Sequence, residues 1–558
     1  MSKLLLILVS LTIGGGNLVA KECKENAIKF INDFETKIAP AYKKAASSTY
    51  KAKISGKETD YKKSSELLIQ LSNIYSDTKD YQVLKDIRQC SDVKKDKDLY
   101  RQLSLIFNLY TSNQIDPKKL KAIIELQTEL ENKFATFRAE VNGKKLTDNQ
   151  IENTLKTSTN SEELEAAWNA SKAIGPVVYA DVKKLVLMRN QAANELGFKN
   201  YHQMMLKLSE QDPNEIEQLF NELDNLTRPA YAKLKMEIDS ALAKKHGITR
   251  SKLRPWHYQN RYFQEAPQIY SIDLDTYYKK ADIAELAQDY YDGIGMNIED
   301  IMDNSDLYER KGKYQHACCD NLDRKKDIRV ICNITPSQRW MDTTLHEFGH
   351  AVYEEYLDQE MPWIYREPAH TFTTEAIAML FGRMASNPEW MHKMLKISKA
   401  EQTSISDTSF KILRMEQLVF SRWSQVMYRF EKAMYENPNQ DLNALWWKLV
   451  EKYQLVKKPA NRNNPDWATK IHVALYPAYY HNYLMGALLA SQLNNYITKN
   501  IIKTEGIKTP SYVGNKEVGQ YFKEKVFYPG RKTYWNNMIK DATGEKLTAK
   551  YYAKDFVK

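Results

Sequence analysis

Apolar residues recur at intervals of three and four along most of this chain, a spacing that places them on one face of an α-helix. Between Lys21 and about residue 250, the segments 64–74, 99–109 and 120–141 show this most clearly. Short turn sequences separate such segments; they include Asp116-Pro117, Asn142-Gly143, Gly175-Pro176 and Asp212-Pro213. The pattern therefore predicts a succession of amphipathic helices in the N-terminal part.

The C-terminal half follows the same pattern, with helices expected near 341–357, 372–385, 410–435 and 479–493. Alternating β-branched residues, the mark of a strand, are confined to 328–334. We therefore expect an all-α protein with one small β element.

No boundary between domains is visible in the composition. The 558 residues include only 19 glycines and 17 prolines, no run of Ser, Gly or Pro divides the chain, and no repeat of fixed period occurs. The formal net charge of +10 comes from lysines spread along the whole length and interleaved with acids, which is typical of solvated helix faces. We expect one large helical body in two lobes, with no nucleic-acid partner.

The first twenty residues have the layout of a signal peptide. Lys3 gives a positive start, Leu4 to Ile13 is almost unbroken in its apolar character, and Leu18-Val19-Ala20 precedes Lys21. Cleavage is expected after Ala20, although Leu18 is large for its place before the cut and leaves the bond open. The apolar run is too short to span a bilayer as a helix. The sequence therefore predicts a secreted or periplasmic protein without stable membrane insertion.

Five cysteines would then lie in an oxidising compartment, where disulfides persist. Cys318, Cys319 and Cys332 bracket a short segment, whereas Cys23 and Cys90 lie far away in the N-terminal part. We expect Cys332 to pair with Cys318 or Cys319. A thiolate zinc site is the alternative, but no Cys-x-x-Cys pair supports it.

The segment His346-Glu347-Phe348-Gly349-His350 is an HExxH motif. Positions four apart lie on one face of a helix, so both imidazoles can reach one metal ion. Glu347 projects beside them, where it can take a proton from water at the metal. The flanking residues are apolar, and two buried histidines without a ligand would be costly. These residues indicate a zinc site with Glu347 as general base.

A catalytic zinc site needs a third protein ligand. Glu375 is the one carboxylate in the apolar segment 372–381, and a metal ion would compensate its buried charge. The alternative is an ion pair with Arg366 or Arg383. The HExxHxxGxxH extension of other zinc peptidases is absent, because Tyr356 stands at its third histidine. Glu375 is therefore the expected third ligand.

These motifs resemble the angiotensin-converting-enzyme family of peptidyl-dipeptidases, over most of residues 250–558. The block 326–332, Met341-Asp342 with the HEFGH segment, and Arg366-Glu367 ahead of Glu375 carry the resemblance. It implies a helical ellipsoid around a deep central cleft, one zinc ion per chain, and oligopeptide substrates. Residues 21–558 would form a single catalytic domain, a monomer, in which 21–250 supply lid helices and 250–558 the metal and substrate site. A more distant likeness is to thimet-type oligopeptidases.

The same resemblance implies several substrate contacts. His316 and Ala317 look like the pair that hydrogen-bonds the substrate backbone, and Gln264, Lys470 and Tyr480 look like the residues that hold its terminal carboxylate. His472 and Tyr483 resemble the residues that stabilise the transition state. The spacing from His472 to the tyrosines is one residue longer than in the family, which leaves Tyr479 as an alternative to Tyr480.

One departure from the family pattern concerns the metal ligands. Met379 stands where the family has an aspartate that supports a ligand histidine. Asp342 or another acceptor must therefore orient a ligand imidazole here.

Three functions follow from these residues. The leading one is a zinc peptidase that removes dipeptides or similarly short pieces from a C-terminus. The second is an internally cutting oligopeptidase of the thimet type, which would not need Lys470 and Gln264 in the cleft. The third is an inactive peptide-binding scaffold, which the complete set of three ligands and Glu347 disfavours.

Overall fold

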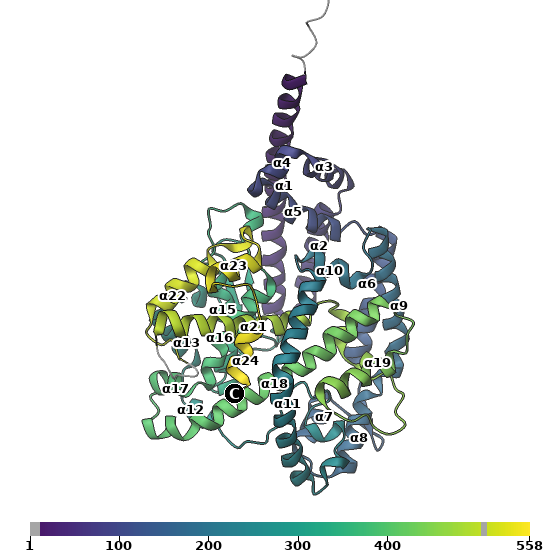
Figure 1. Cartoon of the computed structure of the whole chain (residues 1–558), viewed down its shortest axis with the longest axis vertical. Coiled ribbons are helices and arrows are strands. Elements are labelled where there is room, and N and C mark those ends of the chain that lie inside the picture. Colours follow the sequence, from purple (N-terminus) through teal and green to yellow (C-terminus); the bar gives the residue numbers. More distant parts are fainter. Residues whose placement is uncertain (1–11, 504–509, 558) are drawn as a thin grey trace, which may run out of the picture.

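The computed structural model describes residues 12–503 and 510–557 and is predominantly helical, with two short hairpins (Figure 1). The N-terminal half contains α1 Thr12–Ser55, α2 Glu58–Tyr75, α3 Thr78–Gln89, α4 Ser91–Lys95, α5 Lys97–Ser112, α6 Pro117–Thr136, α7 Asp148–Thr157, α8 Ser161–Lys172, α9 Ile174–Glu195, α10 Tyr201–Leu208 and α11 Pro213–His246. The predicted all-α class is confirmed.

The C-terminal half contains the remaining helices, and all four helices expected there are present. They are α12 Asp275–Tyr278, α13 Ile283–Gly293, α14 Glu299–Asp303, α15 Gln338–Glu355, α16 Thr371–Gly382, α17 Pro388–Met394, α18 Lys399–Glu436, α19 Leu442–Leu449, α20 Ile471–Leu475, α21 His481–Ile497, α22 Lys516–Phe522, α23 Trp535–Thr543 and α24 Lys550–Phe556.

Two of the predicted turn sequences begin helices. The Asp116 carboxylate accepts hydrogen bonds from the backbone N–H groups of Lys118 and Lys119, and Pro117 occupies the first turn of α6. Asp212 and Pro213 begin α11 in the same way. An acidic side chain satisfies N–H groups that have no partner within the helix, and proline lacks the N–H that would be left free.

The expectation of helix up to residue 141 was wrong. Helix α6 ends at Thr136, and β1 Ala139–Val141 then pairs with β2 Lys144–Leu146 in an antiparallel hairpin. Asn142 and Gly143, with φ of 51° and 75°, form its two-residue turn. This left-handed pair matches the twist of a hairpin and cannot continue a helix, so β structure is not confined to 328–334.

The expected strand is present as β4 Ile328–Ile331. It pairs antiparallel with β3 Cys318–Asn321, in a register that sets Cys318 opposite Ile331. Both strands pack against α15. On the other side, α1 approaches the hairpin, with Lys53 paired to Asp320 at 2.7 Å. The hairpin therefore lies between the first helix and the helix that carries the HExxH motif.

Two buried clusters stabilise these layers. The larger one extends from α6 to α24 and includes the apolar sides of α15, α16, α18 and α21. The smaller one joins α1, α3 and α5 to a turn at Trp363–Tyr365, where Phe34 packs edge-on against Trp363. In the view of Figure 1, α6–α9 lie on one side and α13, α15 and α16 on the other, with α11 and α18 between them.

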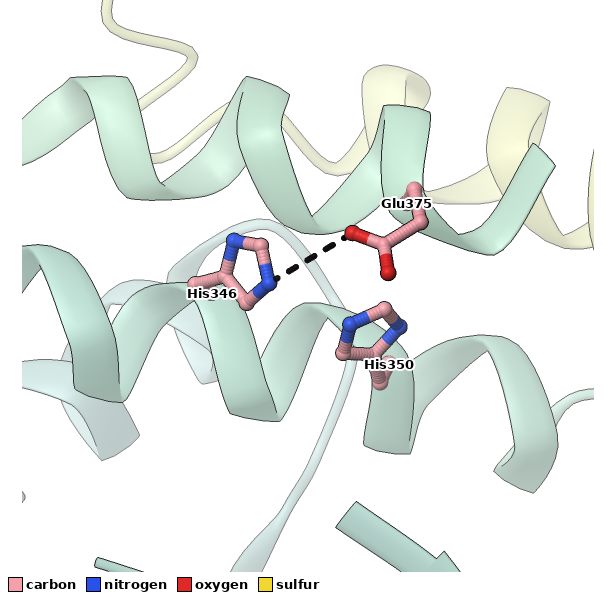
Figure 2. A group of neighbouring side chains, drawn as sticks. All are labelled: His346, His350 and Glu375. Carbon is pink, nitrogen blue, oxygen red and sulfur yellow. Dashed lines mark ion pairs between the residues drawn. The ribbon is translucent and has the colours of Figure 1, made fainter. Parts of the chain in front are cut away.

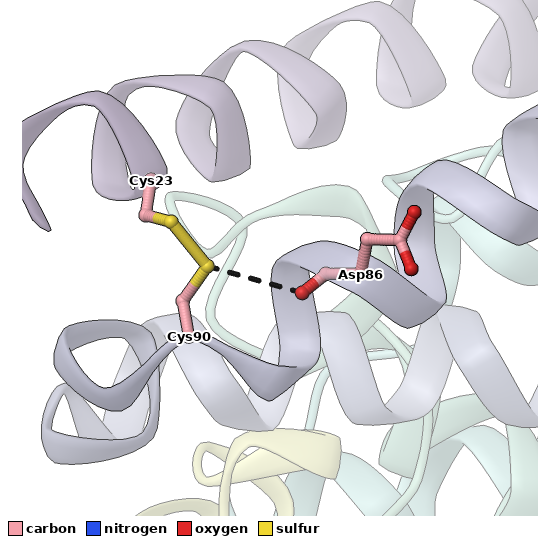
Figure 3. The surroundings of a disulfide bond; sticks show 3 residues. All are labelled: Cys23, Asp86 and Cys90. Atoms are coloured by element: carbon pink, nitrogen blue, oxygen red, sulfur yellow. Dashed lines mark hydrogen bonds between the residues drawn. A yellow bond between two sulfur atoms is a disulfide. The ribbon is translucent and has the colours of Figure 1, made fainter. Parts of the chain in front are cut away.

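The disulfide expectation was wrong. The sulfurs of Cys23 and Cys90 are joined, which ties α1 to the junction of α3 and α4 (Figure 3). Cys318, Cys319 and Cys332 are all free. The register of the hairpin explains this, because Ile331 and Val330 lie opposite Cys318 and Cys319, whereas Cys332 follows the end of β4.

The predicted signal peptide is only partly within the described residues. Residues 1–11 lie outside them, and α1, which begins at Thr12, continues through Ala20 and Lys21. Among the described residues, no helix is both long enough and apolar enough to cross a bilayer.

Candidate active site

Helix α15 places the two motif histidines on one face. The Ser337 side chain caps the helix by accepting a hydrogen bond from the N–H of Trp340 at 3.2 Å. His346 and His350 follow one turn apart, and their ring centroids lie 4.9 Å from each other. The helical period thus produces the arrangement that the motif predicts.

Helix α16 crosses α15 closely enough to add Glu375 to this face. The contact is at Gly349, where a Cβ atom would lie only 2.8 Å from the Cα of Ala378. On its other side α16 packs on α21 through Gly486, where a Cβ atom would lie 3.3 Å from the Cβ of Glu375. Two glycines in helices therefore allow the backbones to approach, which fixes Glu375 opposite the imidazoles.

The three side chains converge on one point (Figure 2). His346 Nε2 and Glu375 Oε2 lie 3.8 Å apart, and one ligand atom from each of His346, His350 and Glu375 falls within 4.8 Å of the others. In the part of the chain that the structure describes, this is the sole cluster of its kind.

Burial governs the protonation of this cluster. It lowers the pKa of His346 to about 4, lowers that of His350 strongly, and raises that of Glu375 to about 7. The imidazoles are therefore neutral and offer lone pairs, while burial favours the protonated form of the Glu375 carboxyl. Two neutral imidazoles with one carboxylate form a donor set that suits zinc and leaves a position for water.

Glu347 lies beside the cluster and is only 8% exposed. Burial, then the charge of Glu375, raises its pKa to about 8. A dication bound by the three neighbouring side chains would oppose both effects and draw this pKa down. The carboxylate form, which can accept a proton, would then prevail at neutral pH.

The partner that orients His350 is a hydroxyl group. Thr374 Oγ1 lies 2.8 Å from His350 Nδ1, which leaves Nε2 for a metal. Among the described residues, no hydrogen bond joins Asp342 to either imidazole, so the acceptor suggested first is not the one used. Thr374 directly precedes Glu375, and one turn of α16 thus supplies both a ligand and an orienting group.

The alternative ion pairs for Glu375 do not form. The Arg366 side chain donates to the carbonyl oxygen of Met361 at 2.6 Å, and the Arg383 side chain donates to Gln417 at 3.2 Å. Glu375 faces His346 instead.

Two of the expected substrate residues meet although 206 positions separate them. Lys470 Nζ donates to Gln264 Oε1 at 2.6 Å. Lys470 is 8% exposed, and its ammonium group lies 5.1, 5.5 and 5.7 Å from the ring centroids of Tyr262, Trp423 and Tyr480. Burial, then the charge of Arg261, lowers its pKa to about 8. Within the described residues Lys470 forms no ion pair, although the more distant charges of Glu265 and Glu152 act to raise its pKa.

The remaining aromatic residues form one group. The ring centroids of His472 and Tyr480 lie 5.1 Å apart, and those of Tyr480 and Tyr483 lie 5.4 Å apart. The Tyr480 hydroxyl accepts a hydrogen bond from Trp423 at 2.7 Å, and the ammonium group of Lys470 lies 5.7 Å from the centroid of the Tyr480 ring. Burial, then the charge of Glu375, raises the pKa of Tyr483.

Tyr479 was named only as an alternative, yet it lies in this group. Its ring centroid is 5.3 Å from that of Tyr483, and burial followed by the Glu375 charge raises its pKa. In the sequence, the spacing from His472 to the tyrosines, one residue longer than in the family, had left both Tyr479 and Tyr480 as candidates.

His316 and Ala317 directly precede β3, His316 in a bend of the chain and exposed, with its ring 5.3 Å from that of Tyr314. No contact places them at the metal cluster itself. They lie on the hairpin that packs along α15.

Two adjoining cavities lie between His346 and Gln264. The larger, of about 880 Å³, reaches the metal cluster at His346 and is bordered by Asp342, Met379 and Glu416. The smaller, of about 430 Å³, is bordered by Gln264. They share the walls formed by Ala266, Gln268, Glu416, Gln417 and Phe420. The two cavities therefore adjoin between His346 and Gln264.

Comparison with known proteins gives a consistent result. A family model described as angiotensin-converting enzyme matches residues 21–554, so the likeness extends well beyond the C-terminal half. The chain is 22% identical over 445 residues to an angiotensin-converting enzyme of Theromyzon tessulatum. The aligned region covers 72% of this chain and 70% of that enzyme. It is 22% identical over 472 residues to one of Mesocricetus auratus, covering 77% of this chain but 35% of that longer protein.

A third similarity is to carboxypeptidase 1 of Bacillus subtilis, at 22% identity over 231 residues, which cover 37% of this chain and 45% of that enzyme. The family match spans nearly the whole chain and both helices of the metal cluster. This protein is therefore a metallopeptidase that belongs to the angiotensin-converting-enzyme family.

Proposed function

We propose that this protein removes dipeptides, or similarly short pieces, from the free C-terminus of oligopeptides in a zinc-dependent reaction. The observation that carries the proposal is the ammonium group of Lys470, which is buried, bonded to Gln264 and without a carboxylate partner among the described residues. A free C-terminus presents a carboxylate that would complete this site. The distance along the cavities to His346 would then set how many residues are released.

The proposal assigns roles to the other side chains. Zinc held by His346, His350 and Glu375 would supply a Lewis acid that polarises the peptide carbonyl and lowers the pKa of water. Glu347 accepts a proton from the attacking water and passes it to the leaving nitrogen. His472 and Tyr483 donate hydrogen bonds to the oxyanion that develops on the carbonyl oxygen.

Substrate binding uses a different set of residues. Gln264, Lys470 and Tyr480 hold the terminal carboxylate, with the Tyr480 hydroxyl already fixed by Trp423. His316 and Ala317 pair with the substrate backbone as an added strand would, because β3 is an edge of its two-stranded sheet.

The test is product analysis by mass spectrometry. Purified protein loaded with zinc is incubated with N-acetylated hexapeptides that carry either a free carboxylate or an amide at the C-terminus. We expect the free peptide to lose its last two residues and the amidated one to be cleaved at least about tenfold more slowly, the loss expected when a buried charge has no partner. Equal cleavage of both at internal bonds would contradict the proposal and favour an internally cutting oligopeptidase.

We also propose that the protein is exported and acts as a monomer that begins near Lys21. The apolar run after Lys3 and the disulfide between Cys23 and Cys90 support export, because disulfides persist in oxidising compartments. Mass measurement of the mature N-terminus, with light scattering for the oligomeric state, would test both statements.

A further inference from the structure

The loop at residues 476–480 joins the two elements that carry the proposed transition-state residues. His472 lies on α20 before the loop, and Tyr483 lies in the first turn of α21 after it. Side chains from two distant helices hold the backbone at the end of α20 and in the middle of the loop. Arg189 of α9 donates to the carbonyl oxygen of Ala474 at 2.8 Å, and Glu431 Oε1 of α18 accepts from the N–H of Ala478 at 2.7 Å.

Both anchors are rigidly held. Arg189 and Glu431 are 2% and 3% exposed. Arg189 also donates to Gln127 Oε1 at 2.9 Å and to the Tyr435 hydroxyl at 3.3 Å. Because α9 and α18 are long helices packed in the main core, these two side chains present fixed hydrogen-bonding groups to the loop backbone.

Ala478 needs such a contact. Its φ of 55° is in the left-handed region, which a residue with a Cβ atom rarely adopts. Such a conformation persists where the surroundings impose it. The hydrogen bond to Glu431 acts at this same residue, immediately before Tyr479, and therefore sets the direction in which the chain enters α21.

We propose that Glu431 is a positioning residue that, with Arg189, holds this loop so that the tyrosines after it face the metal cluster. The inference rests on the proposed function. Three observations support this role: the pair of anchored backbone groups, the left-handed Ala478, and the 5.3 Å separation of the Tyr479 and Tyr483 rings that follow.

The role of Glu431 is to accept a hydrogen bond, not to supply a charge. Burial raises its pKa to about 8, against the hydrogen bond from Ala478 and the charge of Arg189. Two substitutions separate these functions. Glu431→Gln keeps the length and the acceptor oxygen but has no charge, whereas Glu431→Asp keeps the acid but is shorter by about 1.5 Å, one carbon–carbon bond.

The first measurement is amide hydrogen exchange in a peptide covering residues 474–483, which needs no catalysis. We expect protection in the wild type and in Glu431→Gln, and at least about tenfold faster exchange in Glu431→Asp, as for a local opening that has lost its hydrogen bond. Unchanged exchange in Glu431→Asp would overturn the inference, whatever the enzyme cleaves.

The second measurement is steady-state kinetics on the free-ended hexapeptide. For Glu431→Asp we expect kcat to fall at least about tenfold, with KM within about threefold because Lys470 and Gln264 are untouched, while Glu431→Gln stays within about threefold of wild type. The zinc content of both variants should match the wild type. Near-wild-type kcat in Glu431→Asp, or equal losses in both variants, would overturn the inference.

A double-mutant cycle identifies the group through which Glu431 acts. In a Tyr483→Phe background, Glu431→Asp should lower kcat by less than about threefold, because the hydroxyl that it positions is already gone. A full tenfold loss in that background would overturn the assignment. If the wild type cleaves no peptide at all, the proposed function fails instead, and hydrogen exchange still decides the role of Glu431.

Discussion

Thr374 Oγ1 lies 2.8 Å from His350 Nδ1, so a neutral hydroxyl group orients one of the proposed zinc ligands. The resemblance to relatives with an aspartate at the position of Met379 suggested a carboxylate for this task. A hydroxyl fixes the direction of the ring without adding negative charge. Among the described residues, Glu375 is the one acid whose oxygen joins the two imidazoles in a cluster with ligand spacing.

Loss of this hydroxyl should weaken zinc binding. For Thr374→Val, which keeps the shape of the side chain, we expect a zinc affinity lower by about ten- to a hundredfold in chelator competition, because groups that orient a ligand contribute that much. Thr374→Ser retains the hydroxyl and should stay within about threefold of wild type. Unaltered affinity in Thr374→Val would show that packing alone orients His350.

The close crossing of α15 and α16 should not tolerate a methyl group. For Gly349→Ala, with its Cβ 2.8 Å from the Cα of Ala378, we expect a loss of about 1–3 kcal/mol in unfolding free energy and reduced zinc affinity, because the helices must separate. Gly293→Ala is the matched control, since a Cβ there lies 3.6 Å from its nearest neighbour. Wild-type stability of Gly349→Ala in denaturant titration would contradict the proposed contact.

Glu347 should be needed for turnover but not for the metal. Glu347→Gln keeps the size of the side chain and cannot take a proton, so we expect kcat to fall at least about a hundredfold, in line with general-base catalysis. Elemental analysis should still find one zinc per chain, and peptides should still bind. Peptide cleavage at a rate near wild type would assign the base elsewhere.

Lys470 should distinguish a free C-terminus from a blocked one. For Lys470→Met we expect KM to rise at least about tenfold for the free-ended hexapeptide and to change less than about twofold for the amidated one, because only the former presents a charge to this group. Matched initial-rate measurements on the two substrates decide the question. Equal changes for both would place the terminal carboxylate somewhere else.

His202 should make the fold sensitive to acid. It is 3% exposed, and burial lowers its pKa from the ordinary 6.5 to about 3. Below pH 6.5 the unfolded chain therefore binds a proton that the folded chain does not, and the folded state loses stability as pH falls toward 3. Relative to His202→Phe, the wild type should lose about 2–3 kcal/mol of unfolding free energy between pH 7.5 and 4.5. A pH-independent difference in urea titrations would rule this out.

The local pattern of the sequence determined those features of the fold and the metal cluster that depend on helical period. The spacing of His346 and His350 is a property of one helix, and a lone carboxylate in an apolar segment marked Glu375 as a residue in need of a cation. The apolar spacing likewise located the helices that carry the metal cluster, α15 and α16, to within three residues at each end. These features depend on neighbours in the chain, which the sequence shows directly.

Other features were decided by tertiary structure. The pairing of Lys470 with Gln264 was inferred through a family resemblance, and their contact spans 206 positions that no local pattern links. The register of β3 with β4 keeps Cys332 from facing Cys318 or Cys319, and the packing of α1 brings Cys23 to Cys90 instead. Thr374 and Glu431 look like ordinary helix residues in the sequence. Their roles arise because Gly349 lets two helices approach and because Ala478 turns left-handed, and both are properties of packed backbones.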